Sequence, residues 1–208
     1  TPAGSHEDYS ALAVVEEVLV GQPSGRLYKA LVDGKKASSV WSFSPFTKEP
    51  SFMYFNVSVP SDKSLAEAEA TTLGLLDQLA AKPITAAELK RAKANLLKQM
   101  DQVNRNSSYL GTYMSEFIGA GDWRLSFIHR DRVQAMSLDK VNAVLKRYFV
   151  KTNRTVGNFV PTKNPVAVGI KHTEGVDNLV KNYKGKKGFD KGEAFDVSYE
   201  NIQNRLNT

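Results

Sequence analysis

Residues 38–59 have the sequence SSVWSFSPFTKEPSFMYFNVSV, and this stretch decides the fold class. Two runs, 38–46 and 51–59, alternate in side-chain character and flank the turn-forming residues 47–50. The pattern predicts two antiparallel strands joined as a hairpin. One face of the pair is strongly apolar, which favours a sheet covered by helices on that face.

Helical patterns lie on both sides of this hairpin. Apolar spacing, capping residues and breakers predict helices over 5–19, 64–81, 85–103, 109–118 and 137–148, a short helix through 26–31, and a helical or mixed connector over 123–136. Ser5 and Ser24 are the expected N-caps of the first two helices, and Thr85-Ala86-Ala87-Glu88 has the sequence of a capping box. Residues 154–160 predict a last strand. The order predicts an α+β fold, with an antiparallel β-sheet covered on one face by several α-helices.

The end of the chain differs from the rest in composition. Residues 162–208 are rich in Lys, Gly and Asn and contain only short apolar pairs. We therefore expect a domain over 1–161 and an extended linker over 162–208 that leads towards a following domain. The chain begins at Thr1 without an initiator Met, and we expect it to be a piece of a longer chain.

Composition excludes several kinds of protein. The 208 residues include no cysteine, which removes disulfides, thiolate catalysis and cysteine-ligated zinc. The net charge is +6, but basic and acidic residues are interleaved and no basic stripe with stacking aromatics occurs. We expect no nucleic-acid partner. No apolar run of about 18 residues is present, so we expect no membrane span, and no N-terminal signal segment is visible.

The three histidines, His6, His129 and His172, are isolated in sequence. A zinc site needs ligands that converge, and a helical pair places two histidines four residues apart. The motifs H-E-x-x-H and H-x-x-E-H are both absent. We expect ordinary surface or cap histidines and no metal ligands or cofactor in this chain.

Nucleophilic and acid–base catalysis also find no support in the sequence. Ser24 superficially resembles the serine of G-x-S-x-G, but Gln22 breaks the motif, and a helix cap is the better interpretation. Glu16, Glu17, Glu67 and Glu69 are predicted on solvated helix surfaces. We expect no catalytic residue and assign no substrate-binding residue.

Two basic clusters allow a binding interpretation. Arg124, Arg130 and Arg132 can grip a carboxylate or a peptide C-terminus. The alternative, which we favour, is a solvated helix face balanced by Asp122 and Asp131. The lysines and glycines of 184–188 can touch phosphates, but a solvated loop is the better interpretation.

Residues 22–32, QPSGRLYKALV, resemble a segment of pitrilysin/insulinase-family zinc peptidases in which a short turn precedes Ser-x-Arg-Leu-Tyr-x-x-Leu. Further segments resemble family landmarks in the same order: 2–12, 84–93, 121–123 and 153–161. Residues 192–202 resemble the connector between the second and third domains of large bacterial members. The ordered set covers about 1–161.

The resemblance implies a non-catalytic second domain of a bacterial member. In the family, a first domain carries H-x-x-E-H and a downstream Glu, and its two His hold zinc. This chain lacks every position of that motif, so the zinc is expected in a partner catalytic domain, in the same chain or in a partner subunit. A later family domain supplies an Arg and a Tyr that grip substrate. The aligned places here are Val32 and Ser39, which are unsuited to that role.

The resemblance further implies that this domain packs beside the catalytic one and walls a closed chamber for peptides, without activity of its own. The alternative is an inactive scaffold or assembly subunit resembling the core proteins of respiratory complexes. A basic nucleic-acid module is a third hypothesis. The likeness to exported bacterial members implies a periplasmic or otherwise exported protein.

Overall fold

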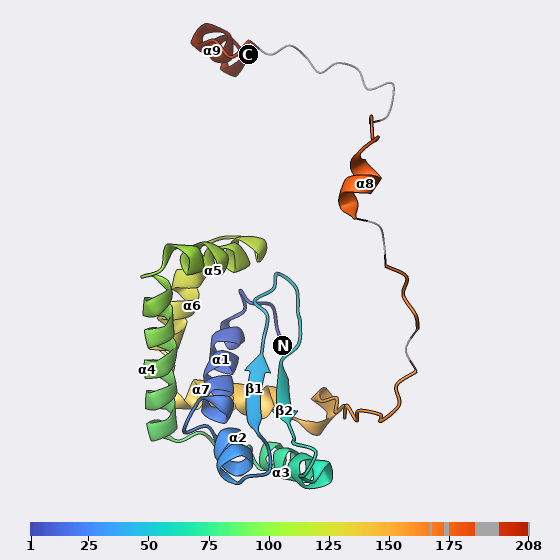
Figure 1. Cartoon of the computed structure of the whole chain (residues 1–208). Helices are drawn as coiled ribbons and strands as arrows, with labels where there is room; N and C mark the ends of the chain where they lie inside the picture. The colour runs from blue at the N-terminus through green and yellow to red at the C-terminus, as the bar shows by residue number, and fades with distance from the viewer. Residues whose placement is uncertain (167, 173–174, 186–195, 208) are drawn as a thin grey trace. The chain divides into compact units, whose positions relative to one another are not determined.

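We analysed a computed structural model of the chain, which describes residues 1–166, 168–172, 175–185 and 196–207 (Figure 1). The chain divides into two compact units, Thr1–Gly157 and Asn158–Thr208. In the part of the chain that the structure describes, no helix is long and apolar enough to cross a membrane.

The first unit contains seven α-helices and one hairpin among its residues, all of which are described. The helices are α1 (Glu7–Val20), α2 (Arg26–Tyr28), α3 (Leu65–Asp77), α4 (Ala86–Val103), α5 (Ser107–Gly119), α6 (Leu125–Gln134) and α7 (Leu138–Tyr148). A π-helical turn, Lys29–Asp33, continues α2, and a 3₁₀ turn, Lys151–Asn153, follows α7. The strands are β1 (Ser39–Phe43) and β2 (Tyr54–Ser58). This is the predicted α+β fold.

Helix α1 lies at the centre of this unit. Figure 1 shows it between α4 and the hairpin, and it also contacts α2, α6 and α7. Leu12, Val15 and Leu19 are buried and belong to the main hydrophobic core. Burial of one such side chain contributes about 1.5–3 kcal/mol, so this central helix organises the packing of its neighbours.

The hairpin is antiparallel, with Trp41 opposite Asn56 and Phe43 opposite Tyr54. Val40, next to Trp41 and opposite Val57, is buried on the other face, towards the core. Both strands are shorter than the expected runs of 38–46 and 51–59.

The last predicted strand, 154–160, is wrong, because these residues are not in a strand. A local sequence preference for extended backbone does not supply a neighbouring strand for the hydrogen-bonded ladder. Val156, Phe159 and Val160 are exposed, so these apolar side chains do not pack on the core.

One predicted helix cap is confirmed and two are wrong. Thr85 caps α4 as predicted, and Ser64 and Ser137 cap α3 and α7. Helix α1 is capped by His6, whose Nδ1 accepts from Asp8 N at 3.0 Å, not by Ser5.

Helix α2 has Gly25 as its N-cap, not Ser24. A Cβ at Gly25 would lie 2.6 Å from the carbonyl oxygen of Leu19. Only glycine fits here, because the backbone passes so close to the end of α1. Gly25 therefore takes the N-cap position, and α2 begins one residue later than predicted.

In the second unit, α8 (Val176–Val180) and α9 (Tyr199–Leu206) are helical. Both lie within 162–208, where the sequence pattern predicted no helix. Ser198 caps α9 by accepting from Asn201 N.

Candidate functional site

The first candidate is a polar network around Arg26, at the start of α2. Its Nε and Nη2 atoms donate to the two carboxylate oxygens of Glu88, each at 2.8 Å. Nη1 and Nη2 also donate to the carbonyl oxygens of Lys82 (2.6 Å) and Pro83 (2.8 Å). The guanidinium therefore joins α2 to the loop before α4 and to α4 itself.

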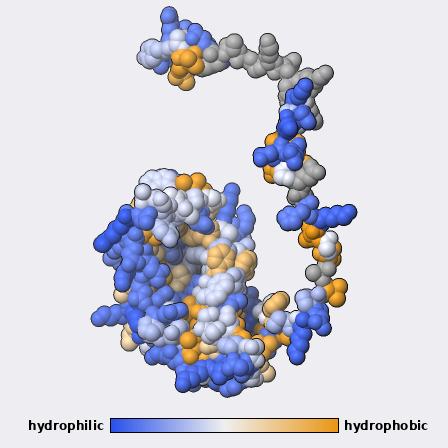
Figure 2. Space-filling model, viewed as in Figure 1, coloured by the Kyte–Doolittle hydropathy of each residue, from blue (hydrophilic) through white to orange (hydrophobic). Residues whose placement is uncertain are grey.

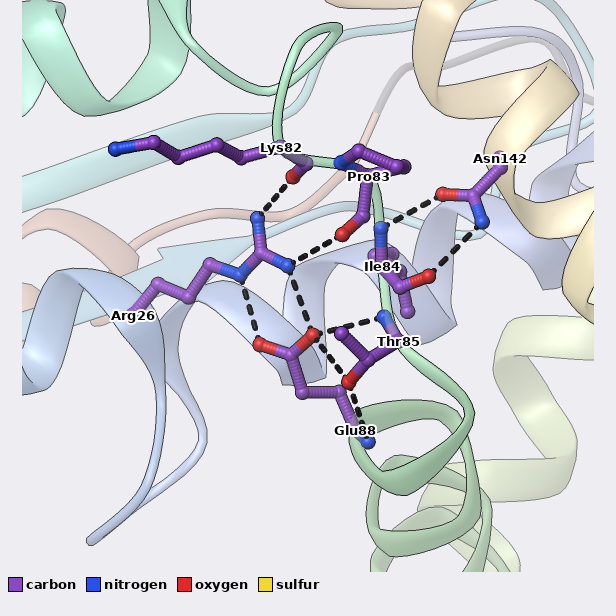
Figure 3. Close-up of polar contacts among 7 residues, drawn as sticks. All are labelled: Arg26, Lys82, Pro83, Ile84, Thr85, Glu88 and Asn142. Atoms are coloured by element: carbon purple, nitrogen blue, oxygen red, sulfur yellow. Dashed lines mark hydrogen bonds and ion pairs between the residues drawn. The ribbon is translucent and has the colours of Figure 1, made fainter.

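The capping box of α4 and Asn142 of α7 extend this network (Figure 3). Glu88 Oε2 accepts from the backbone N–H and the hydroxyl of Thr85, each at 2.9 Å. The backbone N–H of Ile84 donates to Asn142 Oδ1 at 2.8 Å, and Asn142 Nδ2 donates to Ile84 O at 3.0 Å. We call these residues the Arg26 network: Arg26, Lys82, Pro83, Ile84, Thr85, Glu88 and Asn142.

The Arg26 network is an anchor and not a reaction centre. The hydrogen bond from Arg26 holds the pKa of Glu88 at about 2, although partial burial opposes this shift. Glu88 is therefore a carboxylate at neutral pH, and it is paired rather than poised to exchange a proton. The arginine and leucine that carried the family resemblance thus have structural roles, since Leu27 is fully buried.

Asp8 forms a second charged cluster, at the start of α1. Its carboxylate is fully buried and binds Lys140 at 2.9 Å and Arg147 at 2.5 Å, while the hydroxyl of Tyr148 donates to it at 3.2 Å. Burial alone would raise its pKa, but the two cations and the hydroxyl lower it below the ordinary value. This cluster ties α1 to α7.

His129 lies in the interior, on α6. It is hydrogen-bonded through Nδ1 to Ser10 Oγ at 2.9 Å, and the rings of Tyr9, Phe46 and Phe117 surround it. Burial, with a smaller contribution from Arg132, lowers the pKa of His129 to about 4, so the imidazole is neutral at pH 7. The serine lacks the exposure that a nucleophile needs.

The other two histidines lie elsewhere: His6 caps α1, and His172 is exposed in the second unit. Among the described residues, no group of three or more His, Cys, Asp or Glu side chains could hold a metal ion.

The sequence placed Glu16 and Glu17 on a solvated surface, and this is wrong. Both are half-buried, because α4 and β1 pack beside α1. Glu17 accepts from Asn95 Nδ2 at 3.0 Å, and burial raises the pKa of Glu16. On α3, Glu67 is exposed and pairs with Lys36, and Glu69 is half-buried.

The structure gives each arginine of the α6 region its own partner. Arg124 binds both oxygens of Asp122, and Arg130 binds Asp131 and lies 5.3 Å from the ring centre of Phe127. Arg132 donates to the carbonyl oxygen of Ser5 at 2.8 Å. These contacts hold the loop before α6 and the start of α1, and they do not form a shared anion grip.

Val32, Ser39 and Ser24 offer no charged group to a ligand. Val32 is half-buried against the core, and Ser39 lies opposite Ser58 in the hairpin. Ser24 lies in the turn before α2 and its N–H donates to Gly21 O. Of 184–188, residues 184 and 185 are exposed, and 186–188 lie outside the described residues, as do 192–195 of the connector-like segment.

The hairpin has an uncovered face that the sequence reasoning missed. Trp41, Phe43, Phe52 and Tyr54, which we call the aromatic face, are 44%, 48%, 54% and 39% exposed. Their rings contact one another, with centroid distances of 5.2–6.4 Å. Figure 2 shows strongly hydrophilic residues over α3 and α4, and pale to hydrophobic residues over the hairpin. Aromatic residues stand two positions apart in both predicted strands, and this shared spacing could have identified the face.

A second exposed apolar surface lies where α5 meets α6. It consists of Ile118, Trp123, Phe127 and Ile128, which we call the α5–α6 corner. Trp123 and Phe127 are in edge-to-face contact at 5.6 Å. Large exposed apolar patches on soluble domains mark interaction surfaces, and this unit has two.

Comparison with known proteins gives consistent results. A family model described as the peptidase M16 inactive domain matches residues 1–96. The inactive peptidase domain assigned to a zinc protease of Bordetella parapertussis is 34% identical, with a TM-score of 0.71 over 82% of this chain and 91% of that one. A protein of Bordetella pertussis Tohama I, assigned as a zinc protease, is 35% identical, with a TM-score of 0.69 over 77% and 89%.

A protease from Helicobacter pylori has the same fold, with 23% identity and a TM-score of 0.67 over 74% of this chain and 37% of that one. No curated protein matches the chain significantly.

Proposed function

The chain belongs to the inactive-domain family of the M16 peptidases, and from this premise we propose that it packs beside a zinc-bearing catalytic domain and walls a peptide-binding chamber. The catalytic domain would lie in the same chain or in a partner subunit. The Bordetella relatives, assigned to zinc proteases, support the link to that activity.

The main support for the proposal is the exposure of the α5–α6 corner. Its four large apolar side chains are each between 38% and 60% exposed, and Arg130 lies over one of them. Aromatic residues and arginine are enriched at the centres of protein interfaces. This corner is therefore the surface on which we place the catalytic domain.

The zinc of the proposed assembly belongs to the partner domain. The described residues of this chain do not fit such a site, because His129 is engaged with Ser10 inside the core, His6 caps a helix, and no group of three His, Asp or Glu side chains among them could hold a metal. No catalytic step is assigned to this chain. Its contribution is to wall the chamber and hold the peptide in position while the partner performs hydrolysis.

The test combines the purified chain with an H-x-x-E-H domain from the same genome. We expect co-elution in gel filtration, chelator-sensitive peptide cleavage by the mixture, and neither zinc nor cleavage with the chain alone. Trp123→Ser should weaken co-elution, and Tyr109→Ser, an exposed aromatic on α5 outside the corner, should not. Stoichiometric zinc with cleavage by the chain alone would overturn the proposal. Co-elution without cleavage would favour the scaffold instead.

Location follows from the same premise. We place the protein in the periplasm or otherwise outside the cytoplasm, on the resemblance to exported bacterial members, and the absence of cysteine is compatible with this. Cell fractionation of the producing organism tests it, and recovery with the cytoplasmic proteins would contradict it.

A further inference from the structure

We propose that residues 163–184 of the second unit, which we call the lysine segment, bind the surface of an anionic phospholipid bilayer. Its lysines contact the lipid phosphates, and its apolar side chains enter the boundary between the headgroups and the acyl chains. The inference goes beyond the proposed function, because it concerns the second unit and does not require a catalytic partner.

Positive charge in the second unit is concentrated around this segment. Residues 163–187 contain six lysines and two acidic residues, a net charge of +4, whereas 188–208 contain two basic and four acidic residues, a net charge of −2. An anionic bilayer attracts clusters of about four to eight basic residues. The four described lysines of the segment are exposed, and none forms an ion pair with a described residue: Lys163, Lys171, Lys181 and Lys184.

The first half of the lysine segment has a row of branched apolar side chains. Val166, Val168 and Ile170 occupy alternate positions, and each is at least 86% exposed. The described residues of 163–172 lie outside helices and strands. Alternate side chains of an extended chain point to the same side, so these three can enter one apolar layer together.

The second half has an apolar stripe at helical spacing. Val176, Leu179, Val180 and Tyr183 lie three or four residues apart, and each is at least 55% exposed. The backbone N–H of Tyr183 donates to Val180 O at 2.9 Å, so the turn after α8 brings Tyr183 back towards the helix. Side chains at this spacing share one side of a helix. Tyrosine suits the headgroup boundary in particular, because its ring is apolar and its hydroxyl is polar.

This combination favours a lipid surface over a nucleic acid. Single strands are bound by basic grooves together with aromatic rings that stack on bases, and Tyr183 is the only Phe, Trp or Tyr of 163–184. A lysine beside valine or isoleucine can keep its ammonium group in water while its stem covers apolar surface. Such amphipathic segments lie in the interface of anionic membranes. The lysines of 184–188 alone give only unspecific attraction, and the neighbouring apolar side chains add the preference for lipid.

The experiment measures co-sedimentation of the purified 208-residue chain with vesicles at low salt. We expect binding to an equal mixture of phosphatidylcholine and phosphatidylglycerol, weaker binding as salt is added, and little binding to phosphatidylcholine alone. Lys181→Gln with Lys184→Gln should raise Kd about thirtyfold, because each lost lysine weakens binding about fivefold. Lys90→Gln with Lys98→Gln makes the same change in net charge at exposed positions of α4, and should leave Kd almost unchanged.

A second arm tests the apolar contact. Leu179→Ser should raise Kd about tenfold, and Leu206→Ser, at a similarly exposed leucine of α9 in the acidic part, should not. Because the chain has no cysteine, Ile170→Cys and Leu206→Cys each provide a single site for an environment-sensitive dye. On mixed vesicles, the emission of the dye at position 170 should shift to shorter wavelength, and that at position 206 should not.

Several results would overturn the inference. These are the absence of binding to mixed vesicles at low salt, an equal loss for the two lysine pairs, and an unchanged Kd for Leu179→Ser with no shift of the dye at position 170. Tighter binding to a DNA duplex than to mixed vesicles would make a nucleic acid the partner instead. Circular dichroism melting confirms that each variant keeps its fold. Co-elution with the zinc domain is measured separately, so the failure of either proposal leaves the other standing.

Discussion

The Arg26 network and the aromatic face belong to the same unit, but their side chains are used in opposite ways. Arg26 directs its donors to Glu88 and to two main-chain carbonyls, and both charged side chains are less than one-fifth exposed. The rings of Trp41 and Phe43 pack against other rings of the aromatic face, and almost half of each side chain is exposed. The residues that resemble a family signature hold the fold, whereas the surface suited to a partner lies in a stretch that carries no motif.

The largest expected effect comes from breaking the network at its centre. Arg26→Ala removes four hydrogen bonds and leaves Glu88 partly buried without its cation. Because breaking a buried ion pair leaves an uncompensated charge, we expect a loss of about 3 kcal/mol in the free energy of unfolding. Urea denaturation measures it. Arg91→Ala, at an exposed position of α4, is the control. A loss below about 0.5 kcal/mol, as at ordinary surface sites, would contradict the anchoring role.

The next effect is a pH dependence carried by the same pair. The folded-state pKa of Glu88 is lowered from 4.5 to about 2, so its contribution to stability is present above pH 4.5 and is lost as the pH falls towards 2. After allowance for partial solvent exposure, we expect a loss of about 1.5 kcal/mol between pH 6 and pH 3. The measurement compares denaturation of the wild type and Glu88→Gln across this range. Equal pH slopes for the two proteins would show that Glu88 does not titrate as described.

The comparison also shows what the sequence could predict. The capping box at Thr85–Glu88 was predictable, because its hydrogen bonds join residues three apart. The partner of Glu88 was not, because Arg26 lies 62 residues away and is brought close only by tertiary packing. Glu16 was misplaced for the same reason, since its half-burial depends on elements packed beside α1.

The aromatic face shows the same limit of prediction from sequence: a local pattern gives the direction of side chains but not their tertiary surroundings. Alternation correctly separated the two faces of the hairpin, because side-chain direction in a strand is a local property. Which face is covered depends on where the helices pack. Residues 154–160 were predicted as a strand as well, but pairing requires a neighbouring strand, which no local pattern can provide.

A smaller effect separates the cap from the ion pair within the Arg26 network. Thr85→Ala removes the cap to Glu88 N and the hydroxyl donated to Glu88 Oε2, but keeps Arg26 in place. Loss of an N-cap typically costs about 1 kcal/mol, so this variant should retain most of the stability that Arg26→Ala loses. Thr112→Ala, at an exposed position on α5, should be nearly neutral by thermal melting. A cost for Thr85→Ala equal to that of Arg26→Ala would mean that the two act as one unit.

The smallest effect is expected on the aromatic face, and adjacent positions of β1 provide the sharpest comparison. Trp41 is almost half exposed, and its loss in Trp41→Ser removes one edge-to-face contact with Tyr54, which we expect to cost about 0.5 kcal/mol in stability. Val40 points to the opposite face and is buried in the core, so Val40→Ala should cost about 2 kcal/mol through lost burial and a small cavity. Urea denaturation of both variants gives the difference directly. If Trp41→Ser proved as costly as Val40→Ala, the aromatic face would be part of the folding core, and its exposure could no longer be attributed to binding.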